Sequence, residues 1–147
     1  MTDRMGHGPH KIVVVPCSGI GKSYGSVSRE AAYLLTEDIR PQETCLVALS
    51  MLVLGDDGAR ATIAASPAVT IDGCKLACAT KMVQESGGRV IQDFAVLDVY
   101  RRNRQLKPLG IAELNEGGVM LAEAVANEIA ALVDSLDSEE DEGGQDG

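Results

Sequence analysis

Aromatic side chains are scarce in this chain of 147 residues, which has no Trp, one Phe and three Tyr. A core built from this composition is aliphatic, mostly Ala, Val, Leu and Ile. The scarcity also leaves no platform of aromatic rings on which single-stranded nucleic acid could stack. A basic face for duplex DNA does not stand out either, since the formal net charge is −9. We therefore expect no nucleic-acid partner.

Long apolar runs are lacking as well. The longest, around residues 46–54, is too short to span a bilayer. The first ten residues lack the apolar stretch that a signal peptide needs. We therefore expect a cytoplasmic protein with no membrane partner. Because a reducing compartment disfavours disulfides, the four cysteines are expected to bind a metal or to take part in redox chemistry.

Charge and composition divide the chain into three parts. Residues 137–147 carry six acidic residues and no basic one, and we expect a disordered acidic tail there. Residues 1–10 are polar, with Gly and Pro, and are expected to form a flexible arm. Residues 11–136 between them fit a single domain, and a chain of this size can bury a sufficient core without disulfides.

Strand-like and helix-like segments alternate along this domain. β-branched or apolar runs predict strands, and apolar residues at helical spacing predict helices. The expected strands are 11–16, 43–49, 68–71 and 89–96, and the expected helices are 27–35, with Ser26 as N-cap, 56–65, 75–85 and 119–136. Such alternation favours parallel pairing with right-handed crossovers. The predicted fold is α/β, a small open, mostly parallel sheet of about four strands with helices on both faces.

Two of the four cysteines follow predicted strands. Cys17 comes after the first strand and Cys74 after the third, and the carboxyl ends of parallel strands share one edge, where ligands bind. Cys78 follows Cys74 by four residues, a spacing that places both on one face of a helix. Tetrahedral zinc, with Zn–S near ~2.3 Å, needs sulfurs about 3.8 Å apart, so these three thiols can converge on one ion.

The fourth cysteine, Cys45, fits this arrangement less well. It lies near the start of the second predicted strand, at the other edge, unless that strand ends near Leu46. Each cysteine could instead be a small buried hydrophobic residue. The spacing alone is only moderately specific, because the chain lacks the CxxC pairs that are usual in zinc sites.

The segment TIDGCKLAC, residues 70–78, resembles the central motif of the DGC domain family. That family is named for its Asp-Gly-Cys triplet and is assigned a zinc-binding role from four cysteines. The resemblance covers about residues 11–100 and includes the order and context of all four cysteines. The matching segments are Cys17-Ser18-Gly19 after the first strand, Cys45-Leu46, Cys74 in the triplet and Cys78 four residues later. It implies a zinc ligand set of Cys17, Cys45, Cys74 and Cys78, and no reaction.

Four thiolates around Zn²⁺ carry a net charge of −2 that the surroundings must offset. Lys22 and Lys75 lie close in sequence to two of the cysteines and could do so, although both could equally be solvent-exposed. The N–H groups at helix starts after Ser26 and Gly73 could also point at the site. Asp72 could orient a ligand from behind, or it could cap the helix that follows.

Several other motifs are weaker. The run PCSGIGKS, residues 16–23, resembles a P-loop but has Pro16 where the pattern requires Gly. A phosphatase-like nucleophile at Cys17 would need an Arg in its loop, and residues 18–25 contain none. His7 and His10 lie in the predicted arm, with no element to aim them at a metal. The basic residues Arg101, Arg102 and Arg104 fit a solvated loop better than an anion site.

Three functions remain open from the sequence. The first is a metal-binding protein, with zinc as cofactor, whose site is structural or serves in delivery or sensing. The second is a redox or electron-transfer protein with an iron–sulfur cluster on the same cysteines. The third is a thiol enzyme with Cys17 as nucleophile, which is disfavoured because no histidine base is placed near a cysteine by the predicted elements. We assign no reaction and no protein partner.

Overall fold

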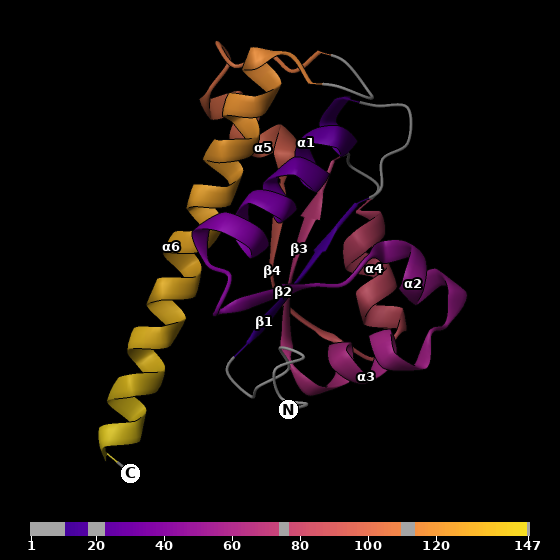
Figure 1. Ribbon diagram of the computed structural model, residues 1–147, viewed down its shortest axis with the longest axis vertical. Coiled ribbons are helices and arrows are strands. Elements are labelled where there is room, and N and C mark those ends of the chain that lie inside the picture. The colour runs from indigo at the N-terminus through magenta and orange to yellow at the C-terminus, as the bar shows by residue number, and fades with distance from the viewer. Residues whose placement is uncertain (1–10, 18–22, 74–76, 110–113, 147) are drawn as a thin grey trace.

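The computed structural model describes residues 11–17, 23–73, 77–109 and 114–146, and it places side chains as far as Leu136. Its four strands and their helices follow in chain order (Figure 1). The elements are β1 (Ile12–Pro16), α1 (Ser23–Tyr33), η2 (Leu34–Ile39, a π-helical turn), β2 (Thr44–Leu46), α2 (Leu49–Leu54), α3 (Asp57–Ala65), β3 (Pro67–Asp72), α4 (Cys78–Glu85), β4 (Arg89–Ala95), α5 (Val96–Arg102) and α6 (Glu116–Asp146).

The strands form one all-parallel sheet in the order β2-β1-β3-β4. The prediction of a small open α/β sheet with four strands is confirmed. β1 lies between β2 and β3, and all five of its residues are buried. Strands buried on both faces are typically continuous β-branched runs, and the sequence IVVVP of β1 follows that rule. The longest strand, β4, is an edge strand and is less buried.

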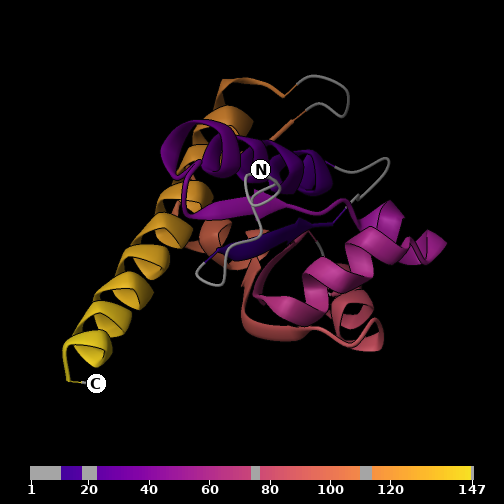
Figure 2. The same cartoon turned by 60° about the horizontal axis from the view of Figure 1, so that its bottom comes forward.

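Helices cover both faces of the sheet, and each face has its own core (Figure 2). On one face, α1, α5 and α6 pack over Val14, Val69 and Ile71. On the other, α2, α3 and α4 pack over Val13 and Val15. Each fully buried aliphatic side chain contributes about 1.5–3 kcal/mol of transfer free energy, so an aliphatic composition suffices for two cores.

Several predicted boundaries are wrong. Ser26 is not the cap of the first helix, because α1 already begins at Ser23 and Ser26 is buried within it. The second strand ends at Leu46 rather than at residue 49. A strand that ends there was the condition under which Cys45 was expected to join the other cysteines. Helix α5 was not predicted. The last helix begins at Glu116 and is assigned through Asp146, beyond the predicted end at residue 136.

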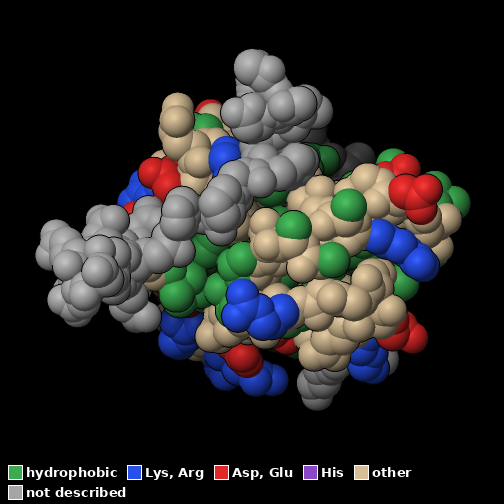
Figure 3. Space-filling view, turned by 90° about the horizontal axis from the view of Figure 1, so that it is seen from below, with side chains coloured by type: hydrophobic (Ala, Val, Ile, Leu, Met, Phe, Trp, Pro, Cys, Tyr) green, Lys and Arg blue, Asp and Glu red, His purple; other side chains and the backbone are tan. Residues whose placement is uncertain are grey.

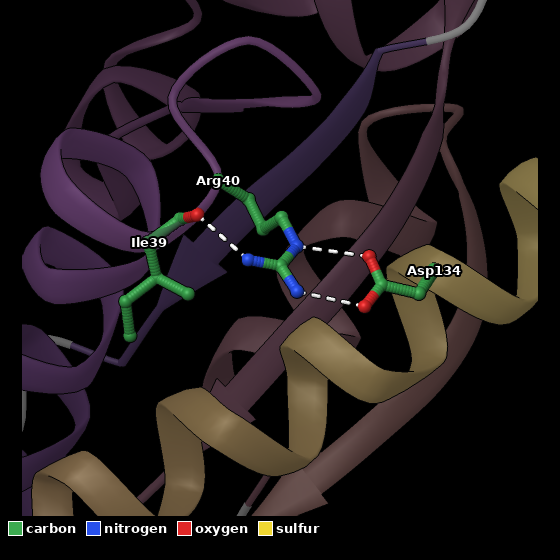
Figure 4. A network of polar contacts seen from close by, with 3 residues as sticks. All are labelled: Ile39, Arg40 and Asp134. Carbon is green, nitrogen blue, oxygen red and sulfur yellow. Dashed lines mark hydrogen bonds and ion pairs between the residues drawn. The ribbon is translucent and has the colours of Figure 1, made fainter.

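Helix α6 is fastened to the body by two ion pairs. The Arg40 guanidinium donates to both carboxylate oxygens of Asp134 at 2.9 and 2.7 Å, and to the Ile39 carbonyl at 2.8 Å (Figure 4). Arg102 donates to the Glu128 carboxylate at 2.7 and 3.2 Å. Exposed pairs of this kind contribute at most about 1 kcal/mol, so the apolar face of α6 provides most of its attachment. Among the helices of the described part, none has both the length and the apolar character needed to cross a membrane.

Candidate metal centre

Two segments meet at the carboxyl edge of the sheet, where β1 and β3 end side by side. The register pairs Pro16 with Ile71, and the Cys17 N–H donates to the Ile71 carbonyl at 2.8 Å. Neighbouring strands lie about 4.8 Å apart. Cys17 therefore lies directly beside the end of β3 and the Asp72-Gly73 turn that follows it, as predicted from the strand-end positions.

Cys17 is held on the α4 side of the sheet. The residue is 4% exposed and belongs to the same core as Val13 and Val15. The three residues are two positions apart from one another, so their side chains lie on the same face of the sheet. On the α1 side, the Ser28 hydroxyl lies 2.9 Å from the Cys17 carbonyl and 2.7 Å from the Gly25 carbonyl. Ser28 is fully buried. It therefore ties the first turns of α1 to the strand end that carries Cys17.

Close packing against α1 requires a glycine at position 73, directly after Asp72. A Cβ at this position would lie 2.9 Å from the Tyr24 carbonyl carbon, 2.9 Å from the Gly25 nitrogen and 3.0 Å from the Tyr24 oxygen. These are backbone atoms of α1, which cannot rotate away as a flexible side chain could. The turn after β3 thus packs directly on the start of α1.

Cys78 is the first residue of α4, and its side chain is exposed. The predicted start of this helix at residue 75 is therefore wrong, because α4 begins at Cys78. The residue before Cys78 is Ala77, with φ 54° and ψ 46° in the left-handed region. Cys74 itself lies outside the described residues, as do Lys22, Lys75, His7 and His10.

Asp72 joins the end of β3 to the start of α4. Its carboxylate accepts the Ala79 N–H at 2.9 Å and the Thr80 hydroxyl at 2.7 Å, and the residue is 1% exposed. Ala77 has no side chain that could cap the helix. Asp72 therefore caps α4 from seven residues away in the chain, as the capping alternative anticipates, and it draws the turn that contains Cys78 to the strand end beside Cys17.

A second carboxyl group lies next to Asp72. The Thr70 hydroxyl is 2.7 Å from the Thr80 hydroxyl and 3.2 Å from an Asp93 carboxylate oxygen. These two contacts and the Thr80–Asp72 bond need three hydrogens, while the two hydroxyls supply only two. All three contacts can be hydrogen bonds at the same time only when Asp93 is protonated. Partial burial, and then the hydrogen bond to Asp72 and its negative charge, raise the pKa of Asp93 to about 6.

Sequence reasoning missed Thr70, Thr80 and Asp93. One pattern could have indicated Thr70. It lies two residues from Asp72, and so on the same face, in a strand that is otherwise apolar. Because a buried polar side chain needs a partner, two of them on the same face predict a polar group on the helix that covers it. Asp93 could not be found this way, since its partners depend on the register of β4.

Cys45 lies elsewhere on the sheet. The register pairs it with Val13, four residues before Cys17, which corresponds to roughly 13 Å along the strand direction. It is partly buried at the edge of the same core. Burial raises the pKa of its thiol, and the nearby Lys11 ammonium opposes that shift. The described backbone therefore brings Cys17 and the start of α4 together and leaves Cys45 apart from them.

The donor set at the strand end suits a thiophilic metal. Within the described residues, no group of three or more His, Cys, Asp or Glu side chains is placed to hold a metal ion. Cys17 lies beside the Asp72-Gly73 turn, and Cys78 begins the helix that Asp72 caps. The third thiol expected there belongs to Cys74, which lies outside the described residues. Thiolates bind Zn²⁺ and iron strongly, so the residues present fit a metal of this class.

The basic run near residue 101 is partly neutralised. Arg101 pairs with Asp98 at 3.3 Å, and Arg102 pairs with Glu128 at 2.7 Å. Arg104 is exposed. Arg101 and Arg102 end helix α5 instead of lying in a loop, but the exposure of the run fits the expectation that it is solvated. On the opposite side of the molecule, seen from below in Figure 3, Lys and Arg side chains are also scattered among acidic, hydrophobic and other atoms.

Comparison with known protein families gives a match over most of the chain. The DGC domain model matches residues 13–116, a span that contains Cys17, Cys45, Cys74, Cys78 and all of the four-stranded sheet except Ile12, the first residue of β1. A search of curated proteins and a search of solved structures each found no match. The family match covers well over half of the chain and includes every cysteine, so the protein belongs to the DGC domain family.

Proposed function

We propose that this protein binds a zinc ion through cysteine thiolates at the carboxyl edge of its sheet. One observation carries the proposal: Asp72 lies beside Cys17 and holds the first turn of α4 through Ala79 and Thr80. Two thiol-bearing residues from distant parts of the chain therefore lie at one strand end. We add Cys74 as a third ligand because it follows Gly73 directly in the sequence.

The proposed ligands are Cys17, Cys74 and Cys78, with Cys45 as the weakest member of the predicted set. The separation of about 13 Å between the positions of Cys45 and Cys17 is several times the ~3.8 Å that two sulfurs on one zinc require. Three protein ligands leave one coordination position for water or an incoming donor. Such an open position suits delivery or sensing, in which the metal must be exchanged, better than a purely structural site.

The charge of the site is consistent with this smaller ligand set. Three thiolates around Zn²⁺ carry a net charge of −1, half of what four would leave. We propose that Lys22 and Lys75 offset this charge, together with the N–H groups of the first turn of α4. Asp72 acts from behind the site: its carboxylate is engaged by the α4 backbone and Thr80, so it orients the helix that carries Cys78 rather than binding the metal.

An iron–sulfur cluster is the main competitor, and the position of Cys45 disfavours it. Clusters held by cysteine alone use four thiolates, and the register pairs Cys45 with Val13, away from the strand end where the other ligands are proposed. A thiol enzyme at Cys17 is disfavoured by burial, because a nucleophile that is 4% exposed presents its sulfur poorly to a substrate. A nucleophile at Cys17 also leaves the exposed cysteine at the start of α4 without a role.

Elemental analysis of anaerobically purified protein, with a visible absorption spectrum, tests the proposal. We expect about one zinc per chain and no charge-transfer bands of an iron–sulfur cluster. Changing Cys17, Cys74 or Cys78 to Ser should each remove most of the zinc, whereas Cys45→Ser is the matched control and should keep it. Iron with acid-labile sulfide, or zinc retained by all three of the first variants, would contradict the proposal.

A further inference from the structure

A bulge in β4 changes the register of this strand against β3 partway along its length. β3 and β4 pair Ala68 with Val90, but the next pair is Val69 with Gln92, so one residue of β4 is skipped. Without this bulge, Thr70 would lie opposite Gln92. With it, Thr70 lies opposite Asp93, on the face that α4 covers. Bulges frequently re-aim a side chain next to a functional site.

The re-aimed Asp93 completes a chain of contacts that ends at the candidate metal centre. The chain runs from Asp93 on β4 through Thr70 on β3 to Thr80 on α4, and from Thr80 to Asp72 at the end of β3. Thr70 is fully buried. Thr80 is the only member on α4, and it touches both Thr70 and Asp72. Its side chain thus fixes the rotation of the first helical turn, which begins with Cys78.

The first turn of α4 needs such an attachment. Ala77, in the left-handed conformation, provides no cap and is itself strained, since an L-residue with a Cβ disfavours this region. Among the described contacts, the Asp72 carboxylate is the one side-chain acceptor for the N–H groups of this turn. The Thr80 hydroxyl holds the second oxygen of that carboxylate and so sets its direction.

We propose that Thr80 is a positioning residue of the metal centre, which holds Cys78 in ligand geometry by being clamped between Asp72 and Thr70. The proposal rests on the proposed function, and it adds a residue that neither the cysteine pattern nor the family match identifies. Groups that orient metal ligands from behind are typically worth 10–100-fold in metal affinity. Removing the Thr80 hydroxyl should therefore weaken zinc binding while leaving every thiol in place.

The test is zinc affinity by chelator competition, with the spectrum of the cobalt-substituted protein and the alkylation rate of Cys78 in the metal-free protein. We expect Thr80→Val to lower affinity about 10–100-fold, shift the cobalt ligand-field bands and change the alkylation rate. Thr80→Ser, which keeps the hydroxyl, should remain within a few-fold of wild type. Thr62→Val is the control for the loss of a helical threonine hydroxyl, because Thr62 donates to the Gly58 carbonyl within α3, outside the site.

The outcomes separate the two claims. Wild type without zinc would overturn the proposed function and the role of Thr80 with it. Wild type that binds zinc, with Thr80→Val unchanged in affinity and cobalt spectrum, would overturn the role of Thr80 alone. If Thr80→Val does not fold, Thr70→Val provides the same test: it removes the other side of the clamp in a strand that tolerates valine, and an affinity equal to that of wild type would then refute the proposal.

Discussion

Replacing Gly73 by Ala tests whether the two cysteine-bearing loops depend on one close contact. The added Cβ would meet three backbone atoms of Tyr24 and Gly25 at 2.9–3.0 Å. Carbon atoms in contact are normally 3.5–4.0 Å apart. The turn after β3 must therefore move away from α1 by about 0.5–1 Å, or α1 must shift by the same amount.

The expected cost follows from that displacement. Overpacking of a close contact by one methyl group typically costs 1–3 kcal/mol. For a domain of about 150 residues, 1 kcal/mol lowers the melting temperature by about 2–4 °C, so we expect a decrease of roughly 4–8 °C for a cost near 2 kcal/mol. The displacement also shifts the start of α4 relative to Cys17, and zinc affinity should fall together with the melting temperature.

Gly87→Ala is the matched control for this experiment. Gly87 has φ +89°, and nothing lies within 4 Å of a Cβ built there, so its substitution adds backbone strain of about 1 kcal/mol without a clash. Because Gly87 follows the far end of α4, zinc affinity should be unchanged. Thermal melting with and without a chelator, and zinc titration, are the measurements. Gly73→Ala with wild-type melting and wild-type affinity would refute the close-contact argument.

Two further changes test the electrostatics and the core. Because the pKa of Asp93 is raised to about 6, its protonated form stabilises the fold below pH 4, and this contribution is lost as pH rises through 6. The stability of Asp93→Asn relative to wild type should therefore rise between pH 4 and 8, by about 1 kcal/mol once the exposure of Asp93 is taken into account. The measurement is urea unfolding of the metal-free proteins, and a difference in free energy of unfolding between variant and wild type that does not vary with pH would contradict this. Ile63→Ala removes a side chain that is 1% exposed between α3 and the sheet, and we expect a loss of about 2–5 kcal/mol in the free energy of unfolding, whereas a loss below about 1 kcal/mol would show that this core is loosely packed.

The class of fold could be predicted because its determinants are local. The β-branched run of β1 and the Pro67–Asp72 run of β3 identify buried strands without reference to the rest of the chain. Their alternation with helices favours parallel pairing, which places Cys17 at the same edge as the residues after Asp72. This part of the candidate site followed from the sequence because parallel pairing places the carboxyl ends of the strands at one edge without reference to side chains.

The remainder of the site depends on non-local geometry. The start of α4 was misplaced because its cap is Asp72, seven residues away, and not a neighbouring side chain. Asp93 reaches the site only through the bulge opposite Ala68 and Val69. Helix α5 was missed because it follows β4 with no intervening turn residue: Ala95 ends the strand and Val96 begins the helix. The predictions of a flexible arm and a disordered acidic tail stay predictions.

The central claim is that three cysteines at one strand end hold a zinc ion, and metal content of single cysteine variants tests it most directly. The measurement is zinc per chain for wild type and the Cys17, Cys45, Cys74 and Cys78 to Ser variants, with melting of each before and after a chelator. We expect about one zinc in wild type and Cys45→Ser, little in the other three, and a metal-free protein that stays folded but melts at a lower temperature. Equal zinc in all five proteins, or none in any, would contradict the account.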